Sequence, residues 1–321
     1  MNGAAYPPIE RPFHAGEQAL QRRAGSFEQL DAMGPRVIRS FMPEQHRQFF
    51  ELLPFVVAGS VDAAGQPWAS VLAGPPGFAR SPDPQQLTVQ ARPWAGDPLA
   101  AALVPGAPLG LLGIQPHTRR RNRMNGIVTA AHADGFTVQV SQSFGNCPKY
   151  IQAREAVYAG PAAPGAVREA ATLDAAARRL VEAADTFFIA TAHPALDADA
   201  AHGVDVSHRG GKPGFLRVEA DGSLTVPDFV GNYFFNTLGN LALNPRCGLL
   251  FMDYATGDLL QLAARASIVW DPEALRAYPG AQRLLRLEVS AMRWLAAASP
   301  LRWSAAELSP VLAPTGPWLS R

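Results

Sequence analysis

The sequence has few cysteines, almost no net charge and no long apolar run. Its 321 residues include 2 cysteines, Cys147 and Cys247, and carry a formal net charge of +1. So few cysteines in a chain of this length indicate a reduced, cytoplasmic protein, and they offer no cysteine set for a zinc or iron–sulfur site. The balanced charge gives no indication of nucleic acid or a membrane surface as a partner, so any basic site must be local.

Targeting and membrane-spanning signals are also missing. Residues 1–18 lack the basic start and apolar run of a secretory signal, and no stretch of about 18 apolar residues occurs. No G-x-G-x-x-G motif follows a predicted strand, which argues against a Rossmann-type dinucleotide-binding domain in this sequence. We therefore expect no membrane-spanning helix and no built-in reductase domain.

Glycine and proline, by contrast, are abundant. The sequence contains 28 Gly and 29 Pro, and 48% of its residues are hydrophobic. This composition favours many short strands and turns over long helices, in a chain long enough for two domains. We expect a mainly β protein with peripheral helices.

Short motifs of the first half return in the second half in the same order. Most are separated by 137 residues (214 − 77 and 224 − 87) and the last by 138 (248 − 110). A repeat this long indicates a duplicated domain, each copy a helix followed by short strands. The matching segments are Ser70 and Ser207, Gly77-Phe78 and Gly214-Phe215, Leu87–Val89 and Leu224–Val226, and Gly110–Leu112 and Gly248–Leu250.

The duplication suggests a division of the chain into five segments. Residues 156–172 are rich in alanine, glycine and proline, as expected of a linker between the two copies. The predicted segments are an N-terminal arm with short helices (1–40), a first domain (41–155), the linker (156–172), a second domain (173–295) and a C-terminal tail (296–321).

The stretch from Asp205 to Arg246 carries the most informative pattern. A basic, glycine-rich turn at His208–Lys212 precedes two strand-like runs joined by Asp221-Gly222, a pair typical of hairpin turns. An asparagine-rich segment follows. Polar groups at both ends of a hairpin predict a ligand-binding edge, although turn formation and helix capping also account for asparagines.

The most basic run is residues 117–126, HTRRRNRMNG. Alternate side chains of a strand share a face, so a strand here would point Arg119, Arg121 and Arg123 the same way. Three guanidinium groups on one face suit bidentate contacts with phosphate. The alternative is a solvated or subunit-facing edge strand that its arginines keep from aggregating.

Two smaller clusters offer other chemistry. In the compact turn Asn146–Tyr150, Lys149 is a candidate anion contact, whereas Cys147 has no identifiable base and is expected to be a small buried residue. His193 and His202, with the aspartates between them, fit no standard metal-ligand spacing. We therefore predict no metal site.

The order of motifs in the second half is a basic glycine turn, GFLRV, a hairpin, LTVPDF, a helix ending in Asn-Pro-Arg, and GLLF. This order resembles the FMN-binding split barrel of the pyridoxamine 5'-phosphate oxidase family. The resemblance is clearest over residues 186–269 and weaker over 55–140. It implies two tandem split β-barrels that form an intramolecular pseudo-dimer, with FMN in the groove between them.

The resemblance also implies where the flavin lies. In the family the isoalloxazine lies against the third strand, which corresponds here to Phe215, Leu216 and Arg217. The phosphate is held at the start of the next helix, where free amides and the helix dipole favour an anion. The corresponding polar residues are Asn232, Asn236 and Thr237, whereas the aromatic run 233–235 is expected in the core.

The sequence departs from the authentic oxidase, because a typical Arg-Lys pair is missing. Other residues must then neutralise the phosphate, and pyridoxine phosphate is not implied as the substrate. The remaining predicted cofactor-binding residues are Ser207, His208, Arg209 and Lys212 in the second half, and Arg119, Arg121, Arg123 and Lys149 in the first.

No residue is identified as a general acid or base, so we expect the cofactor itself to transfer a hydride or two electrons to or from a small molecule. Electrons would come from a separate flavin or pyridine-nucleotide reductase, or from free reduced pyridine nucleotide. One alternative is a non-catalytic protein of the same fold that holds flavin, or haem through His193, His202 or His208. Another is a structural module. The chain would act as a monomeric pseudo-dimer or as a homodimer.

Overall fold

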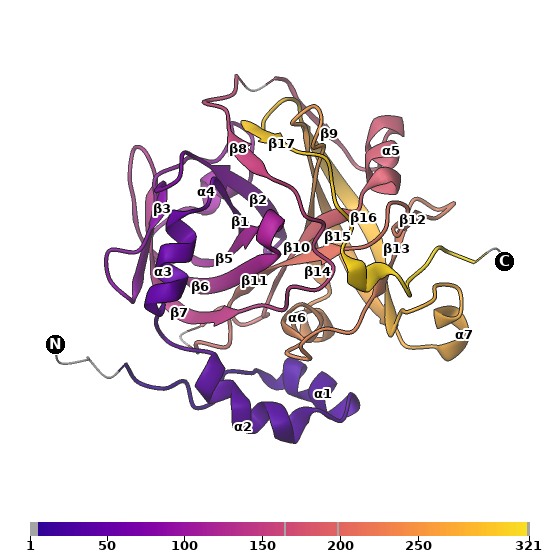
Figure 1. Ribbon diagram of the computed structural model, residues 1–321, viewed down its shortest axis with the longest axis horizontal. Coiled ribbons are helices and arrows are strands. Elements are labelled where there is room, and N and C mark those ends of the chain that lie inside the picture. Colours follow the sequence, from indigo (N-terminus) through magenta and orange to yellow (C-terminus); the bar gives the residue numbers. More distant parts are fainter. Residues whose placement is uncertain (1–5, 164, 198, 320–321) are drawn as a thin grey trace.

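The computed structural model describes residues 6–163, 165–197 and 199–319, and it contains two large antiparallel sheets with short helices around them (Figure 1). The first sheet has the strand order β2-β1-β5-β6-β7-β4-β3, and the second has the order β11-β10-β14-β15-β16-β13-β12. The two orders are identical when the strands are counted from the start of each half. The chain is therefore mainly β, and its duplicated halves form two tandem split barrels within one polypeptide.

The elements fall into an arm, two barrels and the segments that join them. The first half contains α1 (Ala15–Arg23), α2 (Phe27–Val37), α3 (Glu44–Glu51), β1 (Phe55–Val61), β2 (Pro67–Ala73), β3 (Ala79–Arg80), β4 (Gln86–Val89), α4 (Leu99–Ala102), β5 (Pro108–Gln115), η1 (Pro116–Thr118), β6 (Arg120–Ala131) and β7 (Phe136–Gly145). The connecting segment contains β8 (Ala156–Tyr158) and β9 (Val167–Ala170). The second half contains α5 (Ala175–Ala183), β10 (Thr186–Ala192), β11 (Val204–Gly210), β12 (Arg217–Val218), β13 (Leu224–Asp228), α6 (Asn236–Leu243), β14 (Arg246–Met252), β15 (Leu259–Val269), α7 (Pro272–Leu275), β16 (Arg283–Leu295), β17 (Leu301–Trp303) and η2 (Pro310–Leu312).

The long central strands are bent at matching places. The pairing of β6 with β7 shifts register between Asn125 and Gly126, and the pairing of β15 with β16 shifts between Ala263 and Ala264. Since these positions are 138 residues apart (263 − 125), the two halves share this irregularity as well. A bulge increases the local twist of a strand, which helps a sheet to curl into a barrel.

The two barrels meet through strands β1, β2 and β5 of the first and β10, β11 and β14 of the second. A shared apolar cluster fills this junction, with Val57, Val71 and Leu112 from one side and Phe188 and Val206 from the other, all nearly or fully buried. Glycines allow close approach at two equivalent points. A Cβ on Gly110 would lie 2.3 Å from the carbonyl oxygen of Val204, and one on Gly248 would lie 2.3 Å from that of Pro67.

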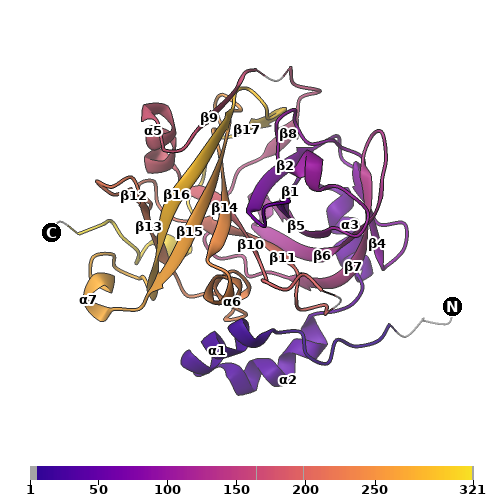
Figure 2. The same cartoon turned by 180° about the vertical axis from the view of Figure 1, so that it is seen from behind.

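The N-terminal arm is fixed against the second barrel. Helices α1 and α2 lie across one end of the molecule, and α1 packs against α6, as the view from behind also shows (Figure 2). Gly16 and Gly239 let the two helices come close, since a Cβ on Gly16 would lie 2.3 Å from the carbonyl oxygen of Gly239. The arm thus reaches the helix whose first turn faces the pocket described below.

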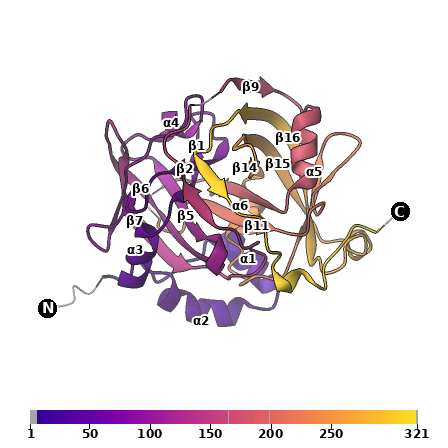
Figure 3. The ribbon, with the colours of Figure 1, turned by 45° about the horizontal axis from the view of Figure 1, so that its top comes forward.

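The segment 156–172, expected as a linker, contributes two strands. Strand β8 pairs with β17, which Figure 1 labels beside it, and β9 pairs with β16, both labelled in Figure 3. The C-terminal tail packs back on the junction, where Trp303 contacts the rings of Phe55 and Tyr254. Within the described residues, no helix has the length and apolar character needed to cross a membrane.

Candidate functional site

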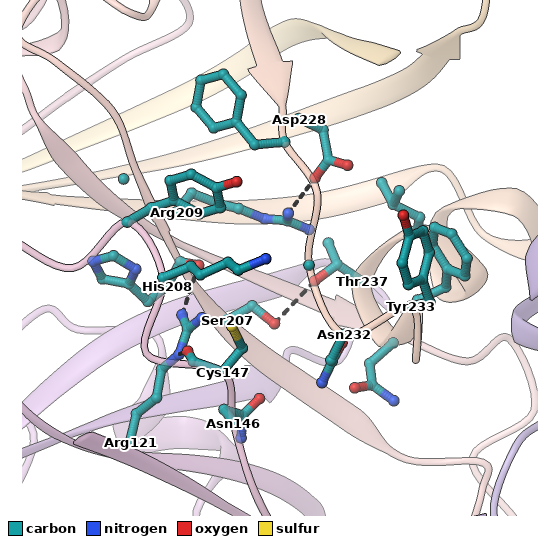
Figure 4. Close-up of a pocket in the computed structure, with 18 of the residues that line it drawn as sticks. Arg121, Asn146, Cys147, Ser207, His208, Arg209, Asp228, Asn232, Tyr233 and Thr237 are labelled. Carbon is teal, nitrogen blue, oxygen red and sulfur yellow. Dashed lines mark hydrogen bonds and ion pairs between the residues drawn. The ribbon is translucent and has the colours of Figure 1, made fainter. Parts of the chain in front are cut away.

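A pocket opens between the barrels beside the first turn of α6 (Figure 4). It encloses about 920 Å³ of space free of protein atoms, part of it open to solvent. Both halves line it, so the site exists only in the paired arrangement. The lining residues are Leu112, Arg121, Arg123, Asn146, Cys147, Lys149 and Tyr150 from the first half, and Ser207–Gly210, Phe215, Pro227–Phe229, Gly231–Tyr233, Phe235–Leu238 and Arg283 from the second.

Arg123, on β6, ties the first barrel to the second. Its Nη1 donates to Oδ1 of Asp205 at 2.8 Å, and its Nη2 donates to the hydroxyl of Ser207. The guanidinium side chain is only 2% exposed, so this is a buried ion pair. Asn125 and Asn240 also donate to the Asp205 carboxylate, at 2.8 and 2.9 Å. The network fixes β6 against β11 at the floor of the pocket.

Arg121 lies two residues earlier on the same face of β6 and has a different environment. Its Nε donates to the carbonyl oxygen of Cys147 at 2.7 Å, and its Nη1 to that of His208 at 3.3 Å. No carboxylate in the described part of the chain forms an ion pair with it. Burial lowers the pKa of Arg121 to about 10, and the nearby cations Arg123 and Arg209 act in the same direction. The group stays charged at neutral pH and faces the pocket with no carboxylate of the described residues beside it.

A second group of cations surrounds Asp228, at the end of β13. Its Oδ1 pairs with Nη1 of Arg209, and its Oδ2 lies 2.8 Å from Nε of Arg283. The carboxylate and Arg283 are buried, with side chains 5% and 3% exposed. One acid thus serves two bases, which leaves a net positive charge at this end of the pocket. Figure 4 shows the pair of Arg209 and Asp228 on the opposite side from Arg121, with Ser207 and Thr237 between them.

The start of α6 is turned toward the pocket by an unusual backbone. Tyr233 and Phe235 have positive φ values of 61° and 63°, which are uncommon for large side chains and reverse the chain just before the helix. The hydroxyl of Thr237, in the first turn, donates to Ser207 Oγ at 2.9 Å. Free amides of a first helical turn, together with these hydroxyls, favour an anion.

The two predicted asparagines line the pocket, but both have partners within the fold. Asn236 donates through Nδ2 to Oε1 of Glu17 at 2.5 Å, which joins the first turn of α6 to the arm. Asn232 accepts from the backbone N–H of Phe234 at 3.2 Å and so shapes the turn. Their polar atoms therefore position the helix start.

The arm contributes a buried histidine near this contact. His14 caps α1, accepting from the N–H of Gly16 at 3.1 Å, and its ring lies 4.9 Å from that of His193. Burial, and then the proximity of His193, lower the pKa of His14 to about 4. The ring is neutral in the folded protein at neutral pH.

The variant His14→Asn tests this state, because the asparagine side-chain oxygen can replace the capping Nδ1 of histidine while the titration is removed. The unfolded chain binds a proton on His14 below about pH 6.5, whereas the folded chain resists protonation until a pH near its lowered pKa. Stability from this group is therefore lost as the pH falls. Relative to His14→Asn, the wild type should lose about 2 kcal/mol of unfolding free energy between pH 7.5 and pH 5. Urea denaturation at both pH values measures it, and a pH-independent difference would contradict it.

His208 lies in the wall of the pocket, 6% exposed, with its ring against Phe188. Burial, with Arg121 and Arg209 as further causes, holds its pKa well below the ordinary value. Its Nδ1 is buried without a hydrogen-bond partner among the described residues, and so are Nε of Arg123 and Nε of Arg209. Unpartnered buried polar atoms are uncommon in proteins, and several in one pocket indicate a ligand that completes them.

The structure brings together ten of the fourteen residues predicted to bind a cofactor and places four elsewhere. The ten in the pocket are Ser207, His208, Arg209, Phe215, Asn232, Asn236, Thr237, Arg121, Arg123 and Lys149. Arg119 stands in a left-handed turn (φ 54°) before β6 begins, and it pairs with Glu307. Lys212 donates to the carbonyl oxygens of Ala313 and Thr315.

Two residues of the expected third strand also lie outside the pocket. Leu216 is buried in the second core, and Arg217 pairs with Glu219 and lies over the ring of Trp318. The strand β12 includes only Arg217–Val218, so Phe215 reaches the pocket from the turn before it.

Sequence reasoning did not select Asp228 and Arg283 as site residues. The sequence signal for Asp228 was a charged residue at the end of an otherwise apolar strand. Arg283 had none, since it lies at the start of β16 among residues without a pattern. For metals the expectation of no site stays a prediction, although no group of three or more His, Cys, Asp or Glu within the described ranges is arranged to hold an ion.

Comparisons with known proteins gave only distant matches. No protein-family model and no curated protein matches the chain. Among solved structures, HupZ of Group A Streptococcus is 12% identical over 38% of this chain and 92% of its own, with a TM-score of 0.29. A FAD-binding protein of Mesorhizobium loti is 14% identical over 40% and 98%, with a TM-score of 0.28.

A third solved structure is a Clostridium acetobutylicum protein of the pyridoxinephosphate oxidase family, related to general stress protein 26. It is 15% identical over 37% of this chain and 79% of its own, with a TM-score of 0.22. Similarity at these TM-scores is too low to locate a site, whereas the strand order and the lining residues of this chain define both fold and pocket.

Proposed function

We propose that the pocket binds FMN and that the protein is an FMN-dependent oxidoreductase acting on a small molecule. The observation that carries the proposal is Arg121, a partly desolvated cation that faces the pocket and has no counter-ion among residues 6–163, 165–197 and 199–319. The charge of the lining supports it. Four arginines and Lys149 line the pocket, and two acids pair with them, Asp228 in the lining and Asp205 behind Arg123, which leaves three positive charges (5 − 2), with His208 neutral. A dianionic phosphate suits such a site.

The phosphate is expected beside the first turn of α6. Ser207 and Thr237 present hydroxyls there, and the free amides of the turn add their partial positive charge. Arg121 projects from the other barrel toward the same region (Figure 4). Hydroxyls, amides and a guanidinium group from two domains are a donor set that fits a phosphate ester.

The flavin ring is expected along the apolar part of the lining. Phe215, Phe229 and Tyr150 lie there, with the rings of Phe229 and Tyr150 5.0 Å apart. Cofactor sites combine such apolar walls with a few polar groups that fix orientation. A bound flavin supplies hydride or two-electron transfer by itself, so the residues of this chain bind, orient and exclude water. The reducing equivalents would come from a separate reductase or from free reduced pyridine nucleotide.

Two arginines of the same basic run provide the test. Arg121→Ala should weaken FMN binding by about 2 kcal/mol, or about 30-fold in Kd, because a charge-assisted contact to the phosphate is lost. Arg119→Ala removes the same side chain two residues away, outside the pocket, and should leave Kd unchanged. Fluorescence quenching of FMN measures both. Equal affinities for the two variants would contradict the proposal.

A further inference from the structure

The duplicated fold implies a second position equivalent to the pocket, with the roles of the barrels exchanged. Pairing registers identify it. Ser207 on β11 is opposite Ile189 of β10, and Ser70 on β2 is opposite Ala58 of β1. On its other side, Ile189 pairs with Leu249 of β14, and Ala58 pairs with Leu111 of β5. Ser70 therefore holds the place of Ser207.

The neighbours of the two serines correspond as well. Arg123, opposite Leu112, donates to the Ser207 hydroxyl across the barrel junction. Gln261, opposite the equivalent Leu250, donates to the hydroxyl of Ser70 across the same junction at 3.1 Å. The contact across the junction is thus retained at the second position, but a neutral amide replaces the guanidinium group.

Two further cations of the pocket, Arg121 and Arg209, have leucines in their places at the second position, where Arg293 instead bonds to the backbone beside Asp97. Leu259, opposite Met252, takes the register that Arg121 has opposite Ile114. Leu72 lies 137 residues before Arg209 (209 − 72), in the equivalent strand. Nothing of the charge that would attract a phosphate in the pocket is repeated in these places.

A carboxylate bonds to Ser70 as the Thr237 hydroxyl bonds to Ser207. Asp97 lies just before the short helix α4, and Thr237 lies in the first turn of α6. Oδ1 of Asp97 accepts from Ser70 Oγ at 2.6 Å and from the N–H of Leu99 at 2.9 Å, and its Oδ2 accepts from Gln261 at 3.2 Å. Asp97, Ser70 and Gln261 are at most 3% exposed.

We propose that each chain binds one ligand, and that the second position is closed by Asp97, whose carboxylate takes the place of the ligand's anionic group. The inference rests on the proposed function for the identity of the ligand. A serine hydroxyl, a helix-start amide and a side chain from the opposite barrel surround Asp97. The same three kinds of donor converge on the open pocket. At the second position the chain's own carboxylate accepts these hydrogen bonds. In the open pocket the corresponding donors remain available to a ligand.

Titration of the wild-type chain with FMN tests the number of sites. The expected result is one flavin per chain, measured by fluorescence quenching against a known protein concentration. Two flavins per chain would overturn this inference and leave the proposed function intact. No flavin at all would overturn the proposed function, and the role of Asp97 would then be decided by the next experiment, which uses no flavin.

The variant Asp97→Ala leaves a space of carboxylate size lined by the same donors. Sodium formate, compared with sodium chloride at equal ionic strength, should raise its Tm by at least about 2 °C by occupying that space. Asp97→Asn, which fills the space, is the matched control and should show no shift. Equal shifts in both variants, or none in either, would overturn the role given to Asp97. Should Asp97→Ala not fold, the wild-type titration still decides the number of sites.

Discussion

Replacing Asp205 with alanine should lower the free energy of unfolding by about 3–5 kcal/mol. The reason is the position of Arg123, whose guanidinium group is buried and has Asp205 as its counter-ion. Without the carboxylate, a buried cation is left with the Ser207 hydroxyl, the amide of Asn125 loses its acceptor, and that of Asn240 keeps only the Thr191 hydroxyl. Equilibrium denaturation in urea, monitored by tryptophan fluorescence, measures the loss.

An exposed ion pair of the same fold is the control. Asp221 pairs with Arg286, and both side chains are about half exposed. Exposed pairs contribute little to stability because solvent screens them. Asp221→Ala should therefore cost far less than Asp205→Ala. Similar losses in the two variants would mean that the junction of the barrels does not depend on the buried pair.

Asp228→Asn should change stability and ligand affinity in opposite directions. The substitution leaves Arg209 and Arg283 without their shared carboxylate, which should lower the free energy of unfolding by about 3 kcal/mol. It also removes an acid that lines the pocket. An anionic ligand should consequently bind about tenfold more tightly at low salt, because the negative charge of Asp228 no longer repels it across the pocket.

The two effects are separated by measuring them independently. Urea denaturation of the ligand-free variant gives the stability, and FMN titration at low salt and at high salt gives the affinity. The gain in affinity should shrink at high salt, because screening weakens a charge effect. Weaker FMN binding by a folded Asp228→Asn protein would contradict the placement of an anion in this pocket.

The fold could be predicted from the sequence because duplication leaves a repeated order of motifs. Ser70 and Ser207, found at matching places in the sequence, hold equivalent registers in the two sheets. The paths of short segments were harder to predict. A strand expected over residues 215–218 is only two residues long, and the presumed linker forms β8 and β9, because tertiary pairing decides such short elements.

The candidate site could be predicted where strand alternation applies. Arg121 and Arg123 share a face of β6, as expected, but Arg119 does not, because a left-handed turn at that residue ends the alternation. Which arginine acquires a carboxylate depends on residues far away in sequence, so the difference between Arg121 and Arg123 was not visible. The same holds for Asp97, whose partner Gln261 is 164 residues away. The role of these residues in binding stays a prediction.

The most direct measurement of the central claim is an absorption spectrum of the freshly purified protein, before and after addition of FMN, with mass analysis of any small molecule released by heat. The account predicts a flavin spectrum, either at once or after reconstitution, and FMN as the released molecule. A protein that stays colourless and does not change the spectrum of added FMN would contradict it, whatever the fold.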